Sequence, residues 1–258
     1  MSAPIPHPTP QPVARARGLS VAYHAEPVLR GVDLTVPAGV VMGVVGPNGS
    51  GKSTLLKAML GLVPRLTGQV EFFGEPLDRV RRRVGYMPQH TSVDWDFPTT
   101  VADVVTMGTY GSLGLFRRPG RKEHARAREA MDRTGITNLA DRQIGQLSGG
   151  QRQRVFLSRT LAQDPDLYLM DEPFQGVDIV SQQAIVDVLH DLRAQGRTIV
   201  LVHHDLGTVP DYCDRVTLLN SGQLIASGAL DEVFTGENLR ITYGLPTDGP
   251  GLPWGASR

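Results

Sequence analysis

The stretch that decides the fold runs from residue 46 to residue 54 and reads Gly46-Pro47-Asn48-Gly49-Ser50-Gly51-Lys52-Ser53-Thr54. It matches the pattern G-x-x-x-x-G-K-[ST] at every position. The glycines allow backbone angles that point successive N–H groups inward, which makes an anion-binding nest at the start of a helix. Lys52 can reach the β- and γ-phosphates of a nucleotide, and the Ser53 hydroxyl can ligate Mg²⁺. We therefore expect residues 46–54 to bind a nucleoside triphosphate and Mg²⁺.

The segments on either side of this loop have the pattern of an α/β protein. Val40–Val45 is a short apolar run typical of a buried strand, and Ser53–Leu62 has the pattern of a helix. A Gly/Ser turn before a helix is the alternative interpretation, but a phosphate loop requires this strand and this helix around it. Apolar runs at 167–170 and 198–202 predict further central parallel strands, with ligands at their carboxyl ends.

Antiparallel strands are predicted at both ends of the chain. Arg15–Tyr23 and Val28–Val36 have the pattern of two early strands that pair antiparallel. Arg215–Leu219 and Gln223–Ser227 flank Asn220-Ser221-Gly222, which predicts a hairpin turn.

Helical patterns interrupt the alternation of strands and helices, and they occur at Val101–Gly108, Lys122–Thr134 and Ser148–Gln163. We interpret them as a helical subdomain inserted at about residues 91–160. The whole of residues 14–246 has no long linker and no internal repeat, which predicts one globular unit. Residues 1–13 and 247–258 are rich in Pro, Gly and small residues and are predicted to be disordered tails.

The bulk properties exclude several classes of protein. The chain has 258 residues, of which 40% are hydrophobic, so it can bury a sizeable core. Lys and Arg number 26 and so do Asp and Glu, and this neutral balance argues against a nucleic-acid binder or a polybasic membrane anchor. The single cysteine, Cys213, permits no intramolecular disulfide. No apolar run suits a membrane span or a signal peptide, so we expect a cytoplasmic chain whose membrane role depends on a partner.

A second predicted strand ends in two acids, in the run Leu167-Tyr168-Leu169-Met170-Asp171-Glu172. A carboxylate without a partner at the edge of a core is costly, so this pattern favours a function. Asp171 can hold Mg²⁺, directly or through water, and Glu172 can polarise the water that attacks the γ-phosphate. A solvent-facing acidic pair is the alternative, and the complete phosphate loop in the same chain argues against it.

A third motif reads Leu147-Ser148-Gly149-Gly150-Gln151 and precedes an apolar helical run. Ser148 suits an N-cap, and the two glycines expose N–H groups at the positive end of a helix, which makes a second anion site. One monomer with one phosphate loop does not need this site. Two monomers that face each other head to tail would need it, since each could place this helix end on the nucleotide of the other. A flexible loop is the alternative only if the pentapeptide is considered in isolation.

With these three motifs in this order, the sequence resembles the ATP-binding cassette (ABC) ATPases from about Arg15 to Tyr243. The resemblance implies a P-loop ATPase core, an antiparallel β subdomain, a helical subdomain and a dimer that holds ATP between its subunits. A homodimer is the expected form, and a pair with a closely related cassette is the alternative. The signature residues of one copy, Ser148, Gly149, Gly150 and Gln151, would complete the ATP site of the other.

Further residues match family elements one by one. Tyr23 resembles the aromatic that stacks on adenine, and a core tyrosine is the alternative. Gln89, in the run Gly85-Tyr86-Met87-Pro88-Gln89, resembles the glutamine that contacts Mg²⁺ and the attacking water. Asp178 lies in Gly176-Val177-Asp178, which resembles the loop that contacts the second cassette.

Two neighbouring histidines compete for the role of the family's switch histidine, which bonds the γ-phosphate. The family's histidine stands at the end of an apolar strand, directly before an aspartate. Asp205 follows His204, so the resemblance selects His204. His203 could face the opposite side of the strand, because neighbouring side chains of a strand point apart.

Several stretches resemble the metal-ion uptake branch of the family: residues 93–98, 111–119, 141–145, 172–178 and 202–206. That branch imports manganese, zinc or iron with a separate metal-binding protein and an integral membrane permease. The resemblance implies an ATP-hydrolysing subunit, peripheral on the inner face of the cell membrane, with no ligands for the imported metal and no nucleic-acid partner. Gln175 departs from the small Thr or Ser expected there, which bears on the local dimer contact.

The resemblance leaves three points of interpretation open. The segment Trp95–Pro98 is a candidate for docking the permease, and a loop anchored by Trp95 in the helical subdomain is the alternative. The cluster Arg79–Arg83 is interpreted as a solvated face, and a binding patch is the alternative. A soluble ABC ATPase that is not coupled to transport is the competing function, although such relatives usually carry two cassettes or a long coiled-coil insertion.

Overall fold

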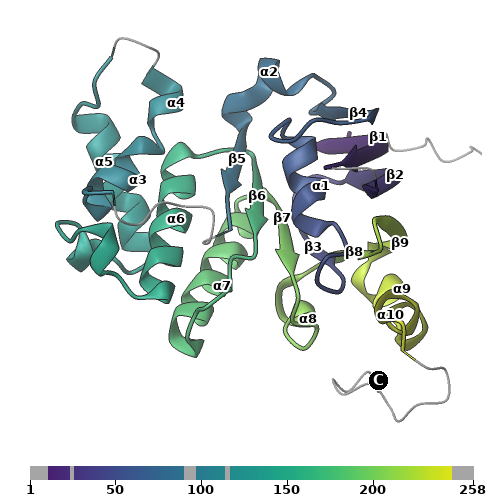
Figure 1. The fold of residues 1–258 in the computed structure, drawn as a ribbon. Coiled ribbons are helices and arrows are strands. Elements are labelled where there is room, and N and C mark those ends of the chain that lie inside the picture. Colours follow the sequence, from purple (N-terminus) through teal and green to yellow (C-terminus); the bar gives the residue numbers. More distant parts are fainter. Residues whose placement is uncertain (1–10, 24–25, 90–96, 114–116, 246–258) are drawn as a thin grey trace, which may run out of the picture.

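The computed structural model describes residues 11–23, 26–89, 97–113 and 117–245. They form two sheets, with a group of helices to one side (Figure 1). This arrangement of an α/β core, an antiparallel sheet and inserted helices confirms the predicted fold class.

The larger sheet has six strands in the order β5-β6-β7-β3-β8-β9. Every neighbouring pair is parallel except β8 and β9, which form an antiparallel hairpin at the edge. The strands β3, β6 and β7 are buried along their whole length, as expected for a sheet covered on both faces. The bounds are β3 (Val41–Val45), β5 (Val84–Met87), β6 (Leu167–Asp171), β7 (Thr198–His203), β8 (Arg215–Asn220) and β9 (Gln223–Ala229).

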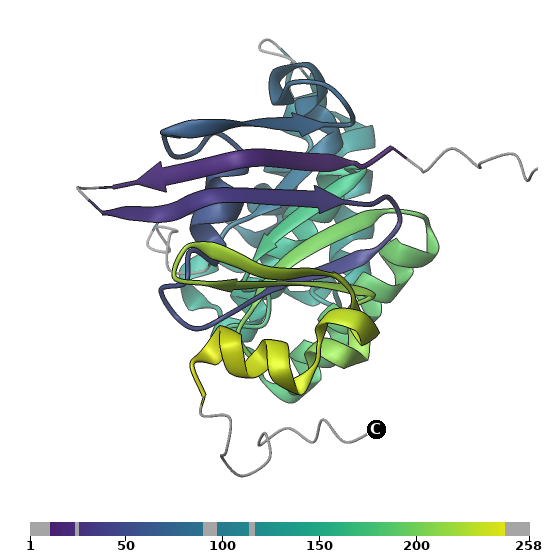
Figure 2. The same cartoon turned by 90° about the vertical axis from the view of Figure 1, so that its right-hand side faces the viewer.

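The smaller sheet is antiparallel and contains β1 (Ala14–Ala22), β2 (Pro27–Val36) and β4 (Thr67–Phe72) in the order β2-β1-β4. Figure 2 shows these strands side by side above the β8–β9 hairpin. In β2, Leu34 and Val36 are buried while Asp33 and Thr35 are exposed, so one face of this sheet packs on the core. The predicted early strands and the predicted hairpin are therefore confirmed.

Helix α1 (Lys52–Met59) lies between the two sheets, and its buried leucines share one core with both of them. The sequence predicted a helix as far as Leu62, but the helix ends at Met59. Gly61 adopts φ 68°, a left-handed conformation that turns the chain away from the helix axis.

The group of helices contains α3 (Val101–Met107), α4 (Tyr110–Leu113), α5 (Arg121–Arg133) and α6 (Gly149–Gln163). Helices α3, α5 and α6 pack on one another, and α6 also contacts β5 and α7 of the core. Buried residues of α3, α5 and α6 belong to the same hydrophobic cluster as β6 and β7. The inserted helices and the α/β core are therefore packed together through α6.

The remaining helices are α2 (Leu77–Val80), α7 (Ile179–Ala194), α8 (Val209–Tyr212), α9 (Leu230–Val233) and α10 (Gly236–Tyr243). The sequence analysis identified neither α7 nor the strands β4 and β5. Among the described residues, no helix has the length and apolar character needed to cross a membrane.

The predicted N-terminal tail differs from the structure at one residue. Val13 is only 7% exposed, and its backbone hydrogen-bonds to that of Val36 and Phe73, so this residue of the predicted tail is held against the smaller sheet, whose first strand begins at Ala14. The other described tail residues, Gln11 and Pro12, precede the sheet. Residues 1–10 and 247–258 of the predicted tails lie outside the described residues.

Candidate nucleotide-binding site

The predicted phosphate loop connects the carboxyl end of β3 to the first residue of α1. Gly46 must be glycine, because a Cβ there would lie 1.9 Å from the carbonyl oxygen of Leu219. Gly51 adopts φ 101° and precedes Lys52, the first residue of the helix. The loop therefore has the geometry that the motif predicts, with Asn48 and Gly49 exposed to solvent and Thr54 half-buried on the helix.

The turn between β8 and β9 is hydrogen-bonded to the phosphate loop. The N–H of Gly222 donates to the carbonyl oxygen of Ser50 at 3.0 Å, and the carbonyl of Gly222 accepts from the N–H of Arg30 at 2.9 Å. Gly222 has φ 74°, and a Cβ at this position would lie 2.2 Å from the carbonyl oxygen of Val28. A single glycine thus joins the phosphate loop to β2 of the smaller sheet.

Lys52 is a buried cation that faces the loop. Its Nζ donates to the carbonyl oxygens of Gly46 and Pro47, each at 2.9 Å, and the residue is only 5% exposed. Burial lowers the pKa of Lys52, and the nearby carboxylates of Glu172 and Asp171 raise it. The ammonium is therefore held at the phosphate loop and next to the acidic end of β6.

Asp171 and Ser53 form a pair that fits a divalent cation. The Ser53 hydroxyl donates to Oδ1 of Asp171 at 2.6 Å. Asp171 is fully buried, and its Oδ2 has no hydrogen-bond partner among the described residues. Burial, the largest effect, raises the pKa of Asp171. An orphaned carboxylate oxygen beside a hydroxyl is the donor set that Mg²⁺ takes at a phosphate site, so these two residues could hold it.

Glu172 follows Asp171 and adopts φ 53°, which is uncommon for a residue with a side chain. Its Oε2 accepts from Nε2 of Gln89 at 3.1 Å, so the structure brings these two predicted residues together. The same amide of Gln89 donates to Oε1 of Gln175 at 3.1 Å. The main-chain carbonyl of Glu172 accepts from Nε2 of Gln153 at 2.9 Å.

Gln153 and Gln175 are residues of this site that the sequence analysis missed. Gln153 is 1% exposed on α6, and a buried amide two residues beyond the signature could have signalled a partner. Gln175 was noted only as a departure in the predicted dimer contact, whereas its side chain contacts Gln89. The contacts Gln153–Glu172 and Gln89–Gln175 each join different elements of the fold, so no pattern of neighbouring residues indicates which partner is contacted.

The two histidines at the end of β7 have different environments. His204 is exposed just beyond the strand, where neighbouring strands carry Val45 and Asp171. His203 is 2% exposed, and its Nε2 lies 2.9 Å from the Thr208 hydroxyl. The two imidazole rings do not point fully apart, since their centroids are 5.6 Å from each other. His204 therefore lies at the same edge of the sheet as the phosphate loop.

The signature residues do not contact the phosphate loop of their own chain. Ser148 caps α6: its Oγ accepts from the N–H of Gln151, and Oε1 of Gln151 accepts from the N–H of Ser148. No hydrogen bond joins residues 148–151 to residues 46–54 in the described part of the chain. Ser148 and Gly149 are exposed, so this helix end is open to a molecule outside the chain.

Asp178 lies next to the signature and also caps a helix. Its side chain accepts from the N–H and the hydroxyl of Ser181 at 2.9 and 3.0 Å, and the backbone hydrogen bond chiefly lowers its pKa. A Cβ on Gly150 would lie 3.1 Å from Oδ2 of Asp178, so these two segments are in close contact. Tyr23 is 51% exposed beyond β1, which excludes the alternative of a core tyrosine.

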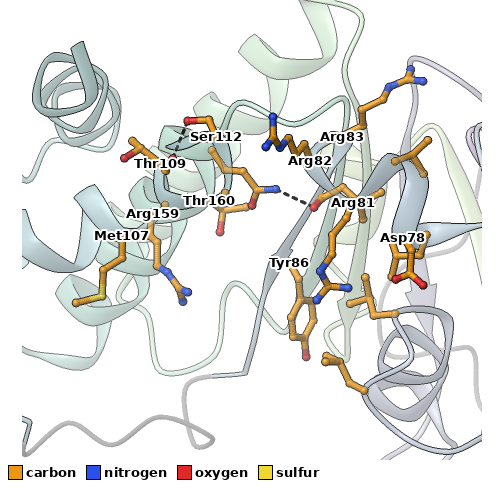
Figure 3. Close-up of a pocket in the computed structure, with 18 of the residues that line it drawn as sticks. Asp78, Arg81, Arg82, Arg83, Tyr86, Met107, Thr109, Ser112, Arg159 and Thr160 are labelled. Carbon is orange, nitrogen blue, oxygen red and sulfur yellow. Dashed lines mark hydrogen bonds between the residues drawn. The ribbon is translucent and has the colours of Figure 1, made fainter. Parts of the chain in front are cut away.

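A separate cavity of about 820 Å³ lies between the core and the helical group (Figure 3). Its lining includes Arg81, Arg82, Tyr86 and Arg159. Neither Arg81 nor Arg82 forms an ion pair among the described residues, and burial lowers the pKa of Arg159. The arginines of the solvated face predicted at residues 79–83 are exposed, and all five residues of this stretch also line the cavity.

Parts of the predicted docking segment and of the metal-uptake motifs lie outside the described residues. Trp95 and Asp96 lie outside the described residues, while Phe97 of the same segment is 58% exposed. Phe116 also lies outside the described residues. No group of three or more His, Cys, Asp or Glu side chains within the described ranges is arranged to hold a metal ion.

Comparisons with known proteins agree with this geometry. A family model described as "ABC transporter" matches residues 29–175. The zinc transport system ATP-binding protein of Treponema pallidum is 57% identical over 88% of this chain and 85% of its own length. The manganese transport system ATP-binding protein of Bacillus subtilis is 51% identical over 88% of this chain and 90% of its own length.

Solved structures have the same fold. An ABC transporter in an inward-facing conformation matches with a TM-score of 0.80 and 30% identity, over 92% of this chain and 90% of that chain. A nucleotide-free ATP-binding cassette from an ABC transporter matches with a TM-score of 0.74 and 26% identity, over 85% and 92%. The phosphate loop, the buried Asp171 and the capped signature helix lie within this shared fold, and the chain belongs to the ABC transporter family as an ATP-binding cassette.

Proposed function

We propose that this chain hydrolyses ATP with Mg²⁺ and thereby drives the import of a divalent metal ion, manganese, zinc or iron, through a membrane permease. The observation that carries the ATPase proposal is the convergence of Lys52, the Ser53–Asp171 pair and the Gln89–Glu172 pair at one edge of the parallel sheet. Transport of manganese or zinc is the role named for the relatives at 57% and 51% identity.

In this proposal, the residues of the chain position the γ-phosphate and the attacking water. Mg²⁺, when bound by Ser53 and Asp171, would supply positive charge against the phosphate oxygens. Lys52 would exchange its contacts with the loop carbonyls for contacts with phosphate oxygens. Glu172 would accept the proton of the water, and the amide of Gln89, 3.1 Å from its Oε2, would orient its carboxylate. His204 would donate a hydrogen bond to the γ-phosphate.

The complete ATP site requires a second cassette, and we propose a homodimer. The support is that Ser148 and Gly149 present an exposed helix N-terminus, which attracts anions, and that within the described residues they form no hydrogen bond with their own phosphate loop. Ser148 to Gln151 of one copy would bind the ATP held by residues 46–54 of the other copy. Asp178 packs closely against Gly150, so the two residues would move together when the dimer forms.

The test of the function is a steady-state assay of phosphate release together with metal uptake. We expect hydrolysis to need Mg²⁺ and to stop on chelation, and we expect cells that lack the chain to lose uptake of one of the three metals. Uptake measured separately for manganese, zinc and iron chooses among them. Co-purification with ribosomes or DNA, in place of a membrane protein, would favour the competing soluble ATPase.

We further propose that the cavity between the core and the helical group binds a segment of the permease that carries acidic side chains. The support is its cationic lining, which contains one acid, Asp78, and the arginines Arg79, Arg81, Arg82, Arg83 and Arg159. Phe97, exposed at the end of the predicted docking segment, belongs to the same proposal.

Reversing the charge of this cavity is expected to lower the stimulation of hydrolysis by the permease without changing the basal rate of hydrolysis. The double variant Arg81→Glu, Arg82→Glu should leave basal ATP hydrolysis unchanged, since neither side chain belongs to the nucleotide site. It should lower permease-stimulated hydrolysis by about tenfold, because the two added charges repel an acidic partner. Arg17→Glu is the matched control, since Arg17 is exposed on β1 of the other sheet. Normal stimulation in the double variant would remove this cavity from the docking proposal.

A further inference from the structure

We propose that His203, the residue next to the predicted switch histidine, is a positioning residue that holds the segment of Glu172 and the segment of His204 in a fixed relation. This inference rests on the proposed ATPase function and adds a residue to it. His203 would touch neither nucleotide nor metal. It would act through two neighbours, Phe174 and Thr208.

The polar side of His203 is fixed to the segment that follows His204. Its Nε2 shares a hydrogen bond with Oγ1 of Thr208 at 2.9 Å. Thr208 Oγ1 in turn lies 3.4 Å from the carbonyl oxygen of Asp205 and 3.4 Å from the hydroxyl of Tyr212. The imidazole therefore closes the loop of residues 204–208 back onto the end of β7, and His204 is the first residue of that loop.

The ring of His203 is fixed to the segment that follows Glu172. The centroids of His203 and Phe174 lie 5.2 Å apart with an interplanar angle of 72°, an edge-to-face arrangement. Tyr212 completes the cluster, 5.2 Å from Phe174 and 6.0 Å from His203. Phe174 is 8% exposed and lies two residues after Glu172, so a shift of this ring would move the backbone that carries the carboxylate.

The main chain between Glu172 and Phe174 transmits such a shift. The N–H of Gln175 donates to the carbonyl oxygen of Glu172 at 3.2 Å, which closes a tight turn around Phe174. Glu172 itself adopts φ 53°, a conformation that persists only when its surroundings hold it. The contact of Phe174 with His203 is one of the interactions that hold this turn.

A simple packed residue at position 203 would not need an imidazole. The site is apolar on the side of Phe174 and polar on the side of Thr208, and histidine has an apolar ring edge and a ring nitrogen that match both sides. Burial lowers the pKa of His203 to about 4, so the ring is neutral and adds no charge near the γ-phosphate. Phenylalanine would keep the ring contact and lose the hydrogen bond, whereas glutamine would keep a polar atom near the place of Nε2.

The experiment measures kcat, KM, the Kd for ATP and the unfolding midpoint for four variants. We expect His203→Phe and Thr208→Val to lower kcat by about 10- to 100-fold while the Kd for ATP changes less than about twofold, because a misplaced carboxylate slows the chemical step more than it weakens nucleotide binding. His203→Gln and Thr208→Ser, which keep the hydrogen bond, should recover most of kcat. The double variant His203→Phe, Thr208→Val should be no slower than either single one.

Thr217→Val is the matched control, because Thr217 is a fully buried threonine whose hydroxyl bonds to Ser227 at 2.8 Å on the far hairpin. It should lower the unfolding midpoint with no loss of kcat in the folded protein. Unchanged kcat in His203→Phe and Thr208→Val would overturn the inference. A decrease of kcat that is proportional to the decrease of the unfolding midpoint in all variants would also overturn it. If the unmodified protein hydrolyses no ATP, the proposed function fails. If the unmodified protein is active and the variants have the same kcat, this inference alone fails.

Discussion

Replacing Glu172 with glutamine is expected to leave ATP binding intact and to lower the rate of hydrolysis by about 10²- to 10⁴-fold. Glutamine has nearly the same shape as glutamate, and its Oε1 can still accept the hydrogen bond from Nε2 of Gln89. What it loses is the ability to take a proton from the attacking water. The backbone at φ 53° is unaffected by this change, so the turn that follows Glu172 should stay in place.

Phosphate release measured at saturating ATP, together with an equilibrium Kd for ATP, checks this result. Because ATP then stays bound, Glu172→Gln should also form a stable dimer in the presence of ATP and Mg²⁺, seen as a doubled mass in solution. Glu129→Gln on α5 is the matched control, since Glu129 is exposed and distant in the fold from β6. Normal turnover in Glu172→Gln would show that another group takes the proton.

Replacing Ser148 with arginine in the Glu172→Gln background is expected to abolish that ATP-dependent dimer. Ser148 is an exposed helix N-cap, and arginine removes the cap and places a bulky side chain where the second copy would dock. The phosphate loop of the same chain makes no contact with Ser148, so each monomer should still bind ATP with nearly unchanged Kd. Loss of the dimer with retained ATP binding is the outcome that a two-chain site requires.

Analytical ultracentrifugation with and without ATP measures the dimer, and a fluorescent nucleotide measures binding. Thr35→Arg is the control, because Thr35 is exposed on β2 and its replacement adds the same side chain on another face. A dimer that persists in the Ser148 variant would place the signature helix outside the interface. Loss of ATP binding along with the dimer would instead indicate that Ser148 supports its own chain's site.

Much of this fold could be predicted because its deciding motifs are local. The phosphate loop, the strand that ends at Asp171 and the cap at Ser148 each depend on a few neighbouring residues, and each lies at the predicted place. Hydrogen bonds between the motifs are less predictable. Gln89 was expected at the site only from the resemblance, and its hydrogen bond to Glu172, 83 positions away, was not predicted.

The contacts that sequence reasoning missed arise from packing. Gln153 and Gln175 reach Glu172 and Gln89 through tertiary contacts, and the contact of His203 with Phe174 is also a tertiary one. Strand β5 was missed because it is only four residues long, too short for a clear period. Helix α7 was missed although its buried face follows a helical spacing, because it begins with two exposed apolar residues, Ile179 and Val180.

The glycine at the β8–β9 turn has a mechanical consequence. Gly222 connects the phosphate loop to β2 through main-chain atoms alone, at 3.0 and 2.9 Å, so side-chain variation on either side leaves the link intact. The phosphate loop is therefore linked by main-chain hydrogen bonds to both sheets, and we expect it to move together with them. We expect the more flexible part of the proposed site to be its other flank, formed by α6 and the segment of Gln89. A conformational change driven by ATP would then move the helices relative to the nucleotide and the two sheets.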